Sequence, residues 1–179
     1  MKLISLIDED FVNYKSAAMY LIFPTCSFKC NTDCGQPVCQ NFSIINNSTV
    51  DITKEALCER YLANSITTAI VCAGLEPLDS PLDLVPFVDC LRNKYHCDDP
   101  IIIYTGYTEA ECEGVDEYTY PKAIIAQTVL VNEYQQLKNY KNIIVKFGRF
   151  IPNDTPHFDP VLGITLVSSN QYAKVISNE

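Results

Sequence analysis

The chain has 179 residues, of which 47% are hydrophobic, and its formal net charge is −9. This length and apolar content are sufficient for one domain with its own core, and we expect residues 1–179 to form that single domain. The negative balance leaves no basic stripe that would neutralise phosphates, so no nucleic-acid partner is predicted. An anionic membrane surface is disfavoured for the same reason.

The cysteine content points to a reducing compartment. No apolar run approaches the ~20 residues that span a bilayer, and the apolar stretch at the N-terminus is too short for a secretory signal. Without such a signal, the nine cysteines are expected to serve metals or catalysis instead of disulfides. We therefore predict a cytoplasmic protein with no membrane partner.

Strands and helices are predicted to alternate along most of the chain. The segments 2–7 and 19–24 predict two strands, and Pro24 ends the second because it cannot donate to a sheet ladder. Asp51 or Thr53 can cap a helix that follows. Further strands are expected at 67–72, 101–104 and 142–147, with helices at 81–95 and 134–140 and an ambiguous apolar piece near 123–125.

This alternation predicts an α/β fold, in which parallel strands are covered by outer helices. Right-handed crossovers place the carboxyl ends of parallel strands at one edge of the sheet. Three loops should therefore meet at that edge, namely 24–41, 74–76 and 105–106. Ligands bind at this edge in α/β folds, so we expect the functional site there.

Four cysteines follow directly after the strand at 19–24: Cys26, Cys30, Cys34 and Cys39. A structural zinc site prefers two close cysteine pairs separated by a long segment, which this loop lacks. An iron–sulfur cluster tolerates such spacings, and with three ligands it keeps one iron open to a bound molecule. A zinc-binding interaction module without enzymatic activity is the alternative interpretation.

The cysteine loop and several later segments together resemble radical S-adenosylmethionine proteins, most closely the activating proteins of anaerobic ribonucleoside-triphosphate reductases. Cys-Ser-Phe-Lys-Cys at 26–30 and Cys-Gln-Asn at 39–41 are similar to the two ends of the family's cluster motif. Gly-Leu-Glu-Pro at 74–77 resembles its Gly-Gly-Glu-Pro element, with Leu75 in place of a glycine. Tyr-Thr-Gly-Tyr-Thr at 104–108 and the segments 148–151 and 168–171 resemble later family segments in the same order.

The resemblance implies a partial (β/α) barrel of radical-SAM type and two cofactors, a [4Fe–4S] cluster and S-adenosyl-L-methionine. It implies Cys26, Cys30 and Cys39 as cluster ligands. Cys34 is the alternative third ligand, because eight residues separate Cys30 from Cys39 where the family has two. The residues implied to bind S-adenosylmethionine are Asn41, Gly74, Glu76, Thr105 and Gly106.

The activity implied by the resemblance is the generation of a glycyl radical on a large anaerobic ribonucleotide reductase subunit. An electron donor such as flavodoxin is implied as a second partner. Two related interpretations stay open, an activator of a different glycyl-radical enzyme and a degenerate relative that keeps a cluster but does not cleave S-adenosylmethionine.

Overall fold

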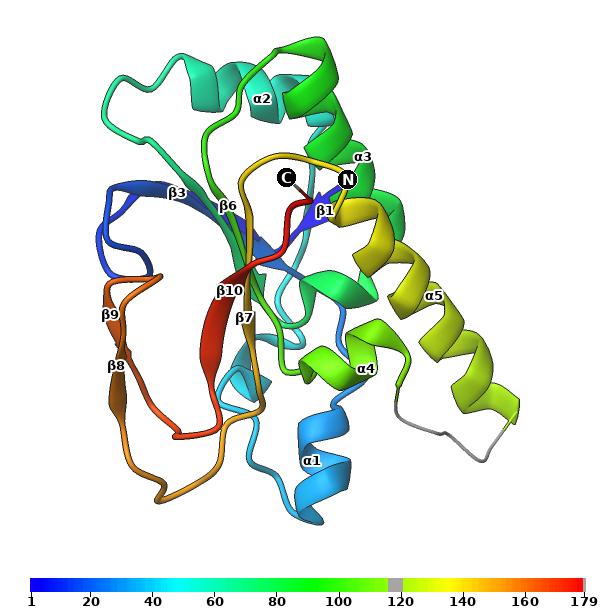
Figure 1. The fold of residues 1–179 in the computed structure, drawn as a ribbon. Coiled ribbons are helices and arrows are strands. Elements are labelled where there is room, and N and C mark those ends of the chain that lie inside the picture. Colours follow the sequence, from blue (N-terminus) through cyan, green and yellow to red (C-terminus); the bar gives the residue numbers. More distant parts are fainter. Residues whose placement is uncertain (116–120, 179) are drawn as a thin grey trace.

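The computed structural model describes residues 1–115 and 121–178, and for residues 121–126 it describes the backbone alone. Its centre is a six-stranded sheet with the order β10-β7-β6-β5-β3-β2 (Figure 1). The strands are β2 (Ser5–Asp10), β3 (Ala18–Phe23), β5 (Ile70–Gly74), β6 (Ile101–Tyr104), β7 (Ile143–Phe147) and β10 (Tyr172–Val175).

The sheet is mixed. Strands β3, β5, β6 and β7 pair in parallel, whereas β2 and β10 pair antiparallel with β3 and β7 at the two edges. The α/β class is thereby confirmed, and the described residues form an open sheet without a closed barrel. The antiparallel edges were not predicted, because the sequence shows where a strand lies but not which neighbour it meets.

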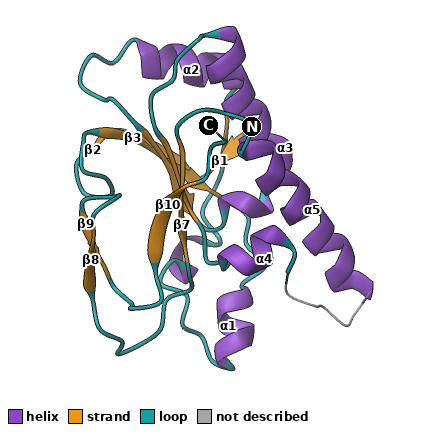
Figure 2. Cartoon of the chain, viewed as in Figure 1, coloured by secondary structure: helices purple, strands orange, loops and turns teal. Residues whose placement is uncertain are grey.

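One face of the sheet is covered by helices (Figure 2). These are α2 (Lys54–Leu62), α3 (Pro81–Asp89), which continues into a π-helical turn at Cys90–Lys94, and α5 (Pro121–Leu137). Alternate strand residues such as Leu21, Cys72 and Ile103 are fully buried beneath them. The side chain of Thr53 accepts the N–H of Ala56 at 3.1 Å and so caps α2 as predicted.

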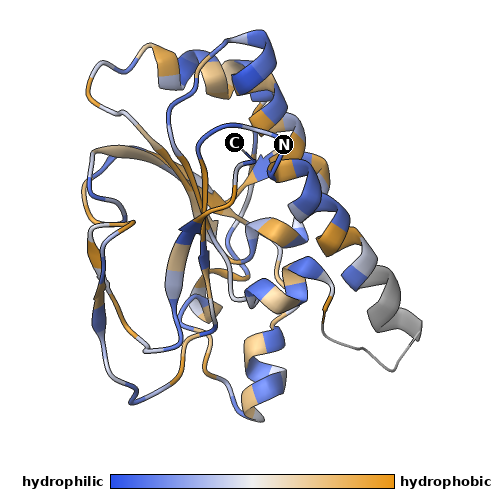
Figure 3. Ribbon diagram, viewed as in Figure 1, coloured by the Kyte–Doolittle hydropathy of each residue, from blue (hydrophilic) through white to orange (hydrophobic). Residues whose placement is uncertain are grey.

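The other face of the sheet is covered by a hairpin, β8 (His157–Asp159) and β9 (Ile164–Leu166). The intervening strand residues, among them Val71, Ile102 and Ile144, pack in one cluster with Leu162 and Leu166. The central strands therefore pack apolar side chains on both faces, which explains their runs of hydrophobic residues. Figure 3 colours the ribbon of these strands mainly in the shades of hydrophobic residues.

Several short elements complete the chain. The predicted first strand is divided into β1 (Lys2–Leu3), which pairs with β4 (Val50–Asp51), and β2. The cysteine loop contains a helix, α1 (Lys29–Cys34), and is followed by a 3₁₀ turn at Phe42–Ile44. A second 3₁₀ turn at Pro77–Asp79 and α4 (Glu109–Glu113) follow β5 and β6. The ambiguous piece near 123–125 belongs to α5.

Within the described ranges, no helix has both the length and the apolar content to cross a membrane.

Candidate metal and cofactor site

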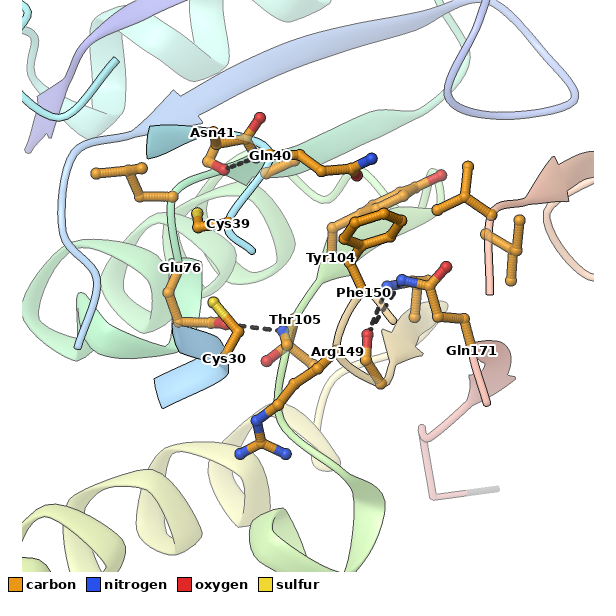
Figure 4. Close-up of a pocket in the computed structure, with 18 of the residues that line it drawn as sticks. Cys30, Cys39, Gln40, Asn41, Glu76, Tyr104, Thr105, Arg149, Phe150 and Gln171 are labelled. Atoms are coloured by element: carbon orange, nitrogen blue, oxygen red, sulfur yellow. Dashed lines mark hydrogen bonds between the residues drawn. The ribbon is translucent and has the colours of Figure 1, made fainter. Parts of the chain in front are cut away.

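A cavity of about 350 Å³ lies where the four parallel strands end (Figure 4). Its walls come from the cysteine loop after β3, the loops after β5 and β6, the end of β7 and the β9 side of the hairpin. This volume falls within the range of small-molecule and cofactor sites. The predicted meeting of three loops at one sheet edge is thus confirmed.

Three of the four loop cysteines line this cavity. Cys26, Cys30 and Cys39 are half-buried there, whereas Cys34 is exposed at the end of α1 and is not part of the cavity wall. The sulfurs of Cys30 and Cys39 lie on the same side of the cavity as Glu76 (Figure 4). In the described part of the chain, no group of three or more His, Cys, Asp or Glu side chains is gathered closely enough to hold a single metal ion.

These sulfurs are partly withdrawn from water, and a backbone N–H donates to the sulfur of Cys26. Burial raises the pKa of Cys26 to about 12, and the backbone N–H of Phe28, 3.2 Å from its Sγ, partly opposes that rise. Burial and the neighbouring Cys39 raise the pKa of Cys30. A bound cation reverses this preference because it deprotonates the thiol that coordinates it. Donation from an N–H to sulfur also suits a cluster ligand.

Gly74 is fixed in the cavity wall by its backbone. Its φ of +91° belongs to the left-handed region, and an added Cβ would lie 2.7 Å from Cγ2 of Ile22 and 2.8 Å from the nitrogen of Phe23. Only glycine fits this position. The side-chain amide of Asn41 donates to the carbonyl of Gly74, which joins the end of the cysteine loop to the end of β5.

Glu76 is buried, with 5% of its surface exposed, and it holds two loops together. Its Oε1 accepts the N–H of Leu78 at 3.2 Å and its Oε2 accepts the N–H of Gly106 at 2.9 Å. Burial raises the pKa of Glu76 to about 8, and these donors, with the Thr105 side chain, oppose the rise. Each carboxylate oxygen keeps a further lone pair, which leaves acceptor capacity for a ligand.

Thr105 and Gly106 form the wall beside Glu76. The Thr105 hydroxyl accepts the N–H of Tyr107 at 3.0 Å. The backbone N–H of Thr105 continues the pairing of β6 with β7 by donating to the carbonyl of Lys146. All five residues expected to bind S-adenosylmethionine therefore line the same cavity as the three cysteines.

Lys146 is a cavity residue that the sequence reasoning missed. It is 7% exposed, its Nζ donates to the carbonyl of Gly148 at 2.8 Å, and burial lowers its pKa to about 8, a shift that Glu76 partly opposes. The available signal was a single charged residue within the otherwise apolar strand Ile143–Phe147. A buried cation facing a cavity is a candidate for contact with an anionic group of a ligand.

An ion-pair network holds α1 against the rest of the fold. Arg149 lies 3.0 Å from Asp33 and 2.7 Å from Glu111, and Lys29 pairs with Glu111 as well. Glu111 is 3% exposed and also caps α4 by accepting the N–H of Thr108 at 2.8 Å. Because α1 contains Cys30, this network fixes one of the three cavity cysteines.

Comparison with known proteins gives no match, whether against protein families, curated proteins or solved structures.

Proposed function

We propose that this chain is a radical S-adenosylmethionine activating protein that uses a [4Fe–4S] cluster to generate a glycyl radical on an anaerobic ribonucleotide reductase. The observation that supports the proposal is that the candidate ligand residues, although distant in the sequence, come together at one place in the fold. Three cysteines and the five residues that the resemblance assigns to S-adenosylmethionine come from three separate loops and line one cavity. An α/β sheet with four parallel strands ending at that cavity is compatible with a partial barrel of radical-SAM type.

The residues present fit such a cofactor pair. Cys26, Cys30 and Cys39 would hold the cluster, since all three sulfur-bearing residues face the cavity and Cys34 does not. Together the cluster and S-adenosylmethionine supply the one-electron chemistry that removes a hydrogen atom from a glycine. The tasks of the protein are to bind, to orient and to exclude water.

Specific side chains are suited to those tasks. Glu76 offers a buried carboxyl group whose position is set by two backbone N–H groups, and a cationic amino group bound beside it would favour its ionised form. Gly74 and Gly106 line the same cavity, and the absence of a side chain at Gly74 lets β5 lie close against Ile22 and Phe23 of β3. Residues 164–167, in and directly after β9, form a further wall of the cavity.

The proposal includes a large glycyl-radical subunit and a one-electron donor such as flavodoxin as partners, in the reducing cytoplasm. An activator of another glycyl-radical enzyme would use the same cavity, so the cavity does not distinguish between the two partners.

The test is an anaerobic reconstitution. The protein is incubated with iron and sulfide, freed of excess metal and assayed for bound iron, sulfide, zinc and visible absorption. We expect a brown protein that releases 5′-deoxyadenosine when dithionite and S-adenosylmethionine are added. A colourless protein that binds zinc would contradict the proposal, and a cluster without 5′-deoxyadenosine would indicate the degenerate relative.

A matched pair of variants tests the ligand set. Cys39→Ala is expected to lose most of the iron, whereas Cys34→Ala is expected to keep it, because Cys39 lines the cavity and Cys34 does not. The reverse result would make Cys34 the third ligand.

A further inference from the structure

One side-chain oxygen closes the long segment between Cys30 and Cys39. Asn31 follows Cys30 in α1, and its Oδ1 accepts the backbone N–H groups of both Val38 and Cys39 at 2.9 Å. The chain thus leaves α1 after the exposed Cys34 and returns to within hydrogen-bond distance of the residue beside Cys30. Eight intervening residues are folded back by this pair of bonds.

The same oxygen also contacts the first of the two cysteines. The thiol of Cys30 donates to Oδ1 of Asn31 at 3.8 Å, so one side-chain oxygen holds the Sγ of Cys30 and the backbone of Cys39. The residues that follow Cys39 are held by different contacts. The Asn41 amide donates to Gly74, and the Phe42 ring packs edge-on against Phe28 with their centroids 5.7 Å apart.

We infer that Asn31 is a positioning residue that sets the spacing of Cys30 and Cys39, and that it thereby permits a cluster loop with eight residues between two ligands. This inference rests on the proposed function. Closing a flexible segment opposes its conformational entropy, and two hydrogen bonds to one fixed oxygen offset part of that entropy before any metal binds. Without them, Cys39 would sample positions remote from Cys30 and cluster assembly would compete with iron loss.

Three variants isolate the acceptor oxygen of Asn31. Asn31→Leu keeps the size of the side chain and removes the acceptor, whereas Asn31→Asp keeps an oxygen that can accept both N–H groups. The matched control is Asn64→Leu, because Asn64 also accepts a backbone N–H, from Ile66 at 2.9 Å, but lies outside the cavity wall. Each variant is reconstituted anaerobically and assayed for iron and sulfide, for the electron paramagnetic resonance spectrum of the reduced cluster, and for iron loss to a chelator.

We expect Asn31→Leu to hold less than half of the wild-type iron, to lose it at least tenfold faster and to show an altered resonance spectrum. Asn31→Asp and Asn64→Leu should stay within twofold of the wild type in iron content and loss rate. Wild-type behaviour of Asn31→Leu in all three measurements, or equal losses in Asn31→Leu and Asn31→Asp, would overturn the inference.

A second measurement uses the metal-free protein and is independent of the cluster. Diamide oxidises two adjacent thiols to a disulfide and is itself reduced to the hydrazine, and mass spectrometry of peptides reports the rate of the Cys30–Cys39 linkage. We expect Asn31→Leu to slow this linkage at least tenfold and Asn31→Asp to restore it. If Asn31→Leu does not fold by circular dichroism, Asn31→Ser takes its place, since its side chain is too short to reach both N–H groups.

The two proposals fail separately. Wild-type protein that never binds iron and sulfide contradicts the proposed function, while the rate of disulfide formation still decides whether Asn31 sets the spacing. Wild-type protein that binds a cluster, together with an unaffected Asn31→Leu, contradicts the inference alone.

Discussion

Replacement of Glu133 by methionine should stabilise the protein in a pH-dependent way. Glu133 lies in α5 with 1% of its surface exposed, and neither carboxyl oxygen has a hydrogen-bond partner among the described residues. Burial raises its pKa from 4.5 to about 9, with the negative charges of Glu76 and Asp79 adding to the rise. The side chain is therefore protonated in the folded protein at neutral pH.

The size of the effect follows from proton linkage. In the unfolded chain the carboxyl ionises above pH 4.5, so folding at pH 7 has to take up a proton, which lowers the free energy of unfolding by about 3 kcal/mol. The loss is absent below pH 4.5 and grows by about 1.4 kcal/mol per pH unit until the folded pKa is reached. Glu133→Met should therefore be about 3 kcal/mol more stable at pH 7, and less than about 1 kcal/mol more stable from this source at pH 5.

Urea unfolding of the metal-free protein, followed by circular dichroism at pH 5, 6, 7 and 8, measures this difference. Glu55→Met is the control, because Glu55 is a partly exposed glutamate on α2 that pairs with Lys94 at 3.7 Å. Its stability difference should change little with pH. If the advantage of Glu133→Met were the same at all four pH values, the carboxyl would be ionised in the folded state and the reasoning would be refuted.

Three further changes are expected to alter stability. Gly74→Ala should lower the free energy of unfolding by about 3 kcal/mol, because φ is +91° there and the new Cβ would clash with Ile22. Its control is Gly35→Ala, where φ is +63° and no atom lies within 4 Å of the new Cβ. Gly35→Ala should lower the free energy of unfolding by about 1 kcal/mol in the same urea titration. Arg92→Met should remove about 3 kcal/mol in thermal unfolding, because its guanidinium donates to three backbone carbonyls at 2.6–3.0 Å. Lys146→Met should stabilise the metal-free protein by about 3 kcal/mol at pH 7, and this gain should shrink as the pH rises from 8 towards 10.5, the opposite trend to that of Glu133→Met.

The sequence was sufficient for the elements whose pattern is local. The strands β6 and β7 and the cap at Thr53 agree with the prediction to within a residue, since continuous apolar runs and a capping side chain are readable without knowledge of the fold. The site could be located for a related reason. Parallel strands place their carboxyl ends together, so loops at 24–41, 74–76 and 105–106 had to meet if the strands were parallel.

The elements that the sequence did not predict depend on distant partners. The hairpin β8–β9 is short, and its residues Ile164 and Leu166 form a strand because they pack on the sheet face that they cover, a contact that the local sequence does not indicate. The same holds for Asn31, whose side chain looks like any polar residue of a loop until the return of the chain places two N–H groups beside it. Lys146 differs, because a single charged residue inside an apolar strand can be recognised from the sequence alone.

The buried charges at the cavity are difficult to explain by stability alone. Lys146 and Glu76 are almost fully buried, and burial moves the pKa of each towards its neutral form, which means that water once solvating these groups has not been fully replaced by protein partners. Because methionine in place of Lys146 should make the folded protein more stable, the stability of the fold does not account for this lysine. A ligand with ionised groups of both signs would place an opposite charge beside each of these two residues in one cavity. The features least favourable to the fold are therefore gathered where the proposed cofactor would bind, as expected when a site is organised for a ligand at some cost to the folded chain.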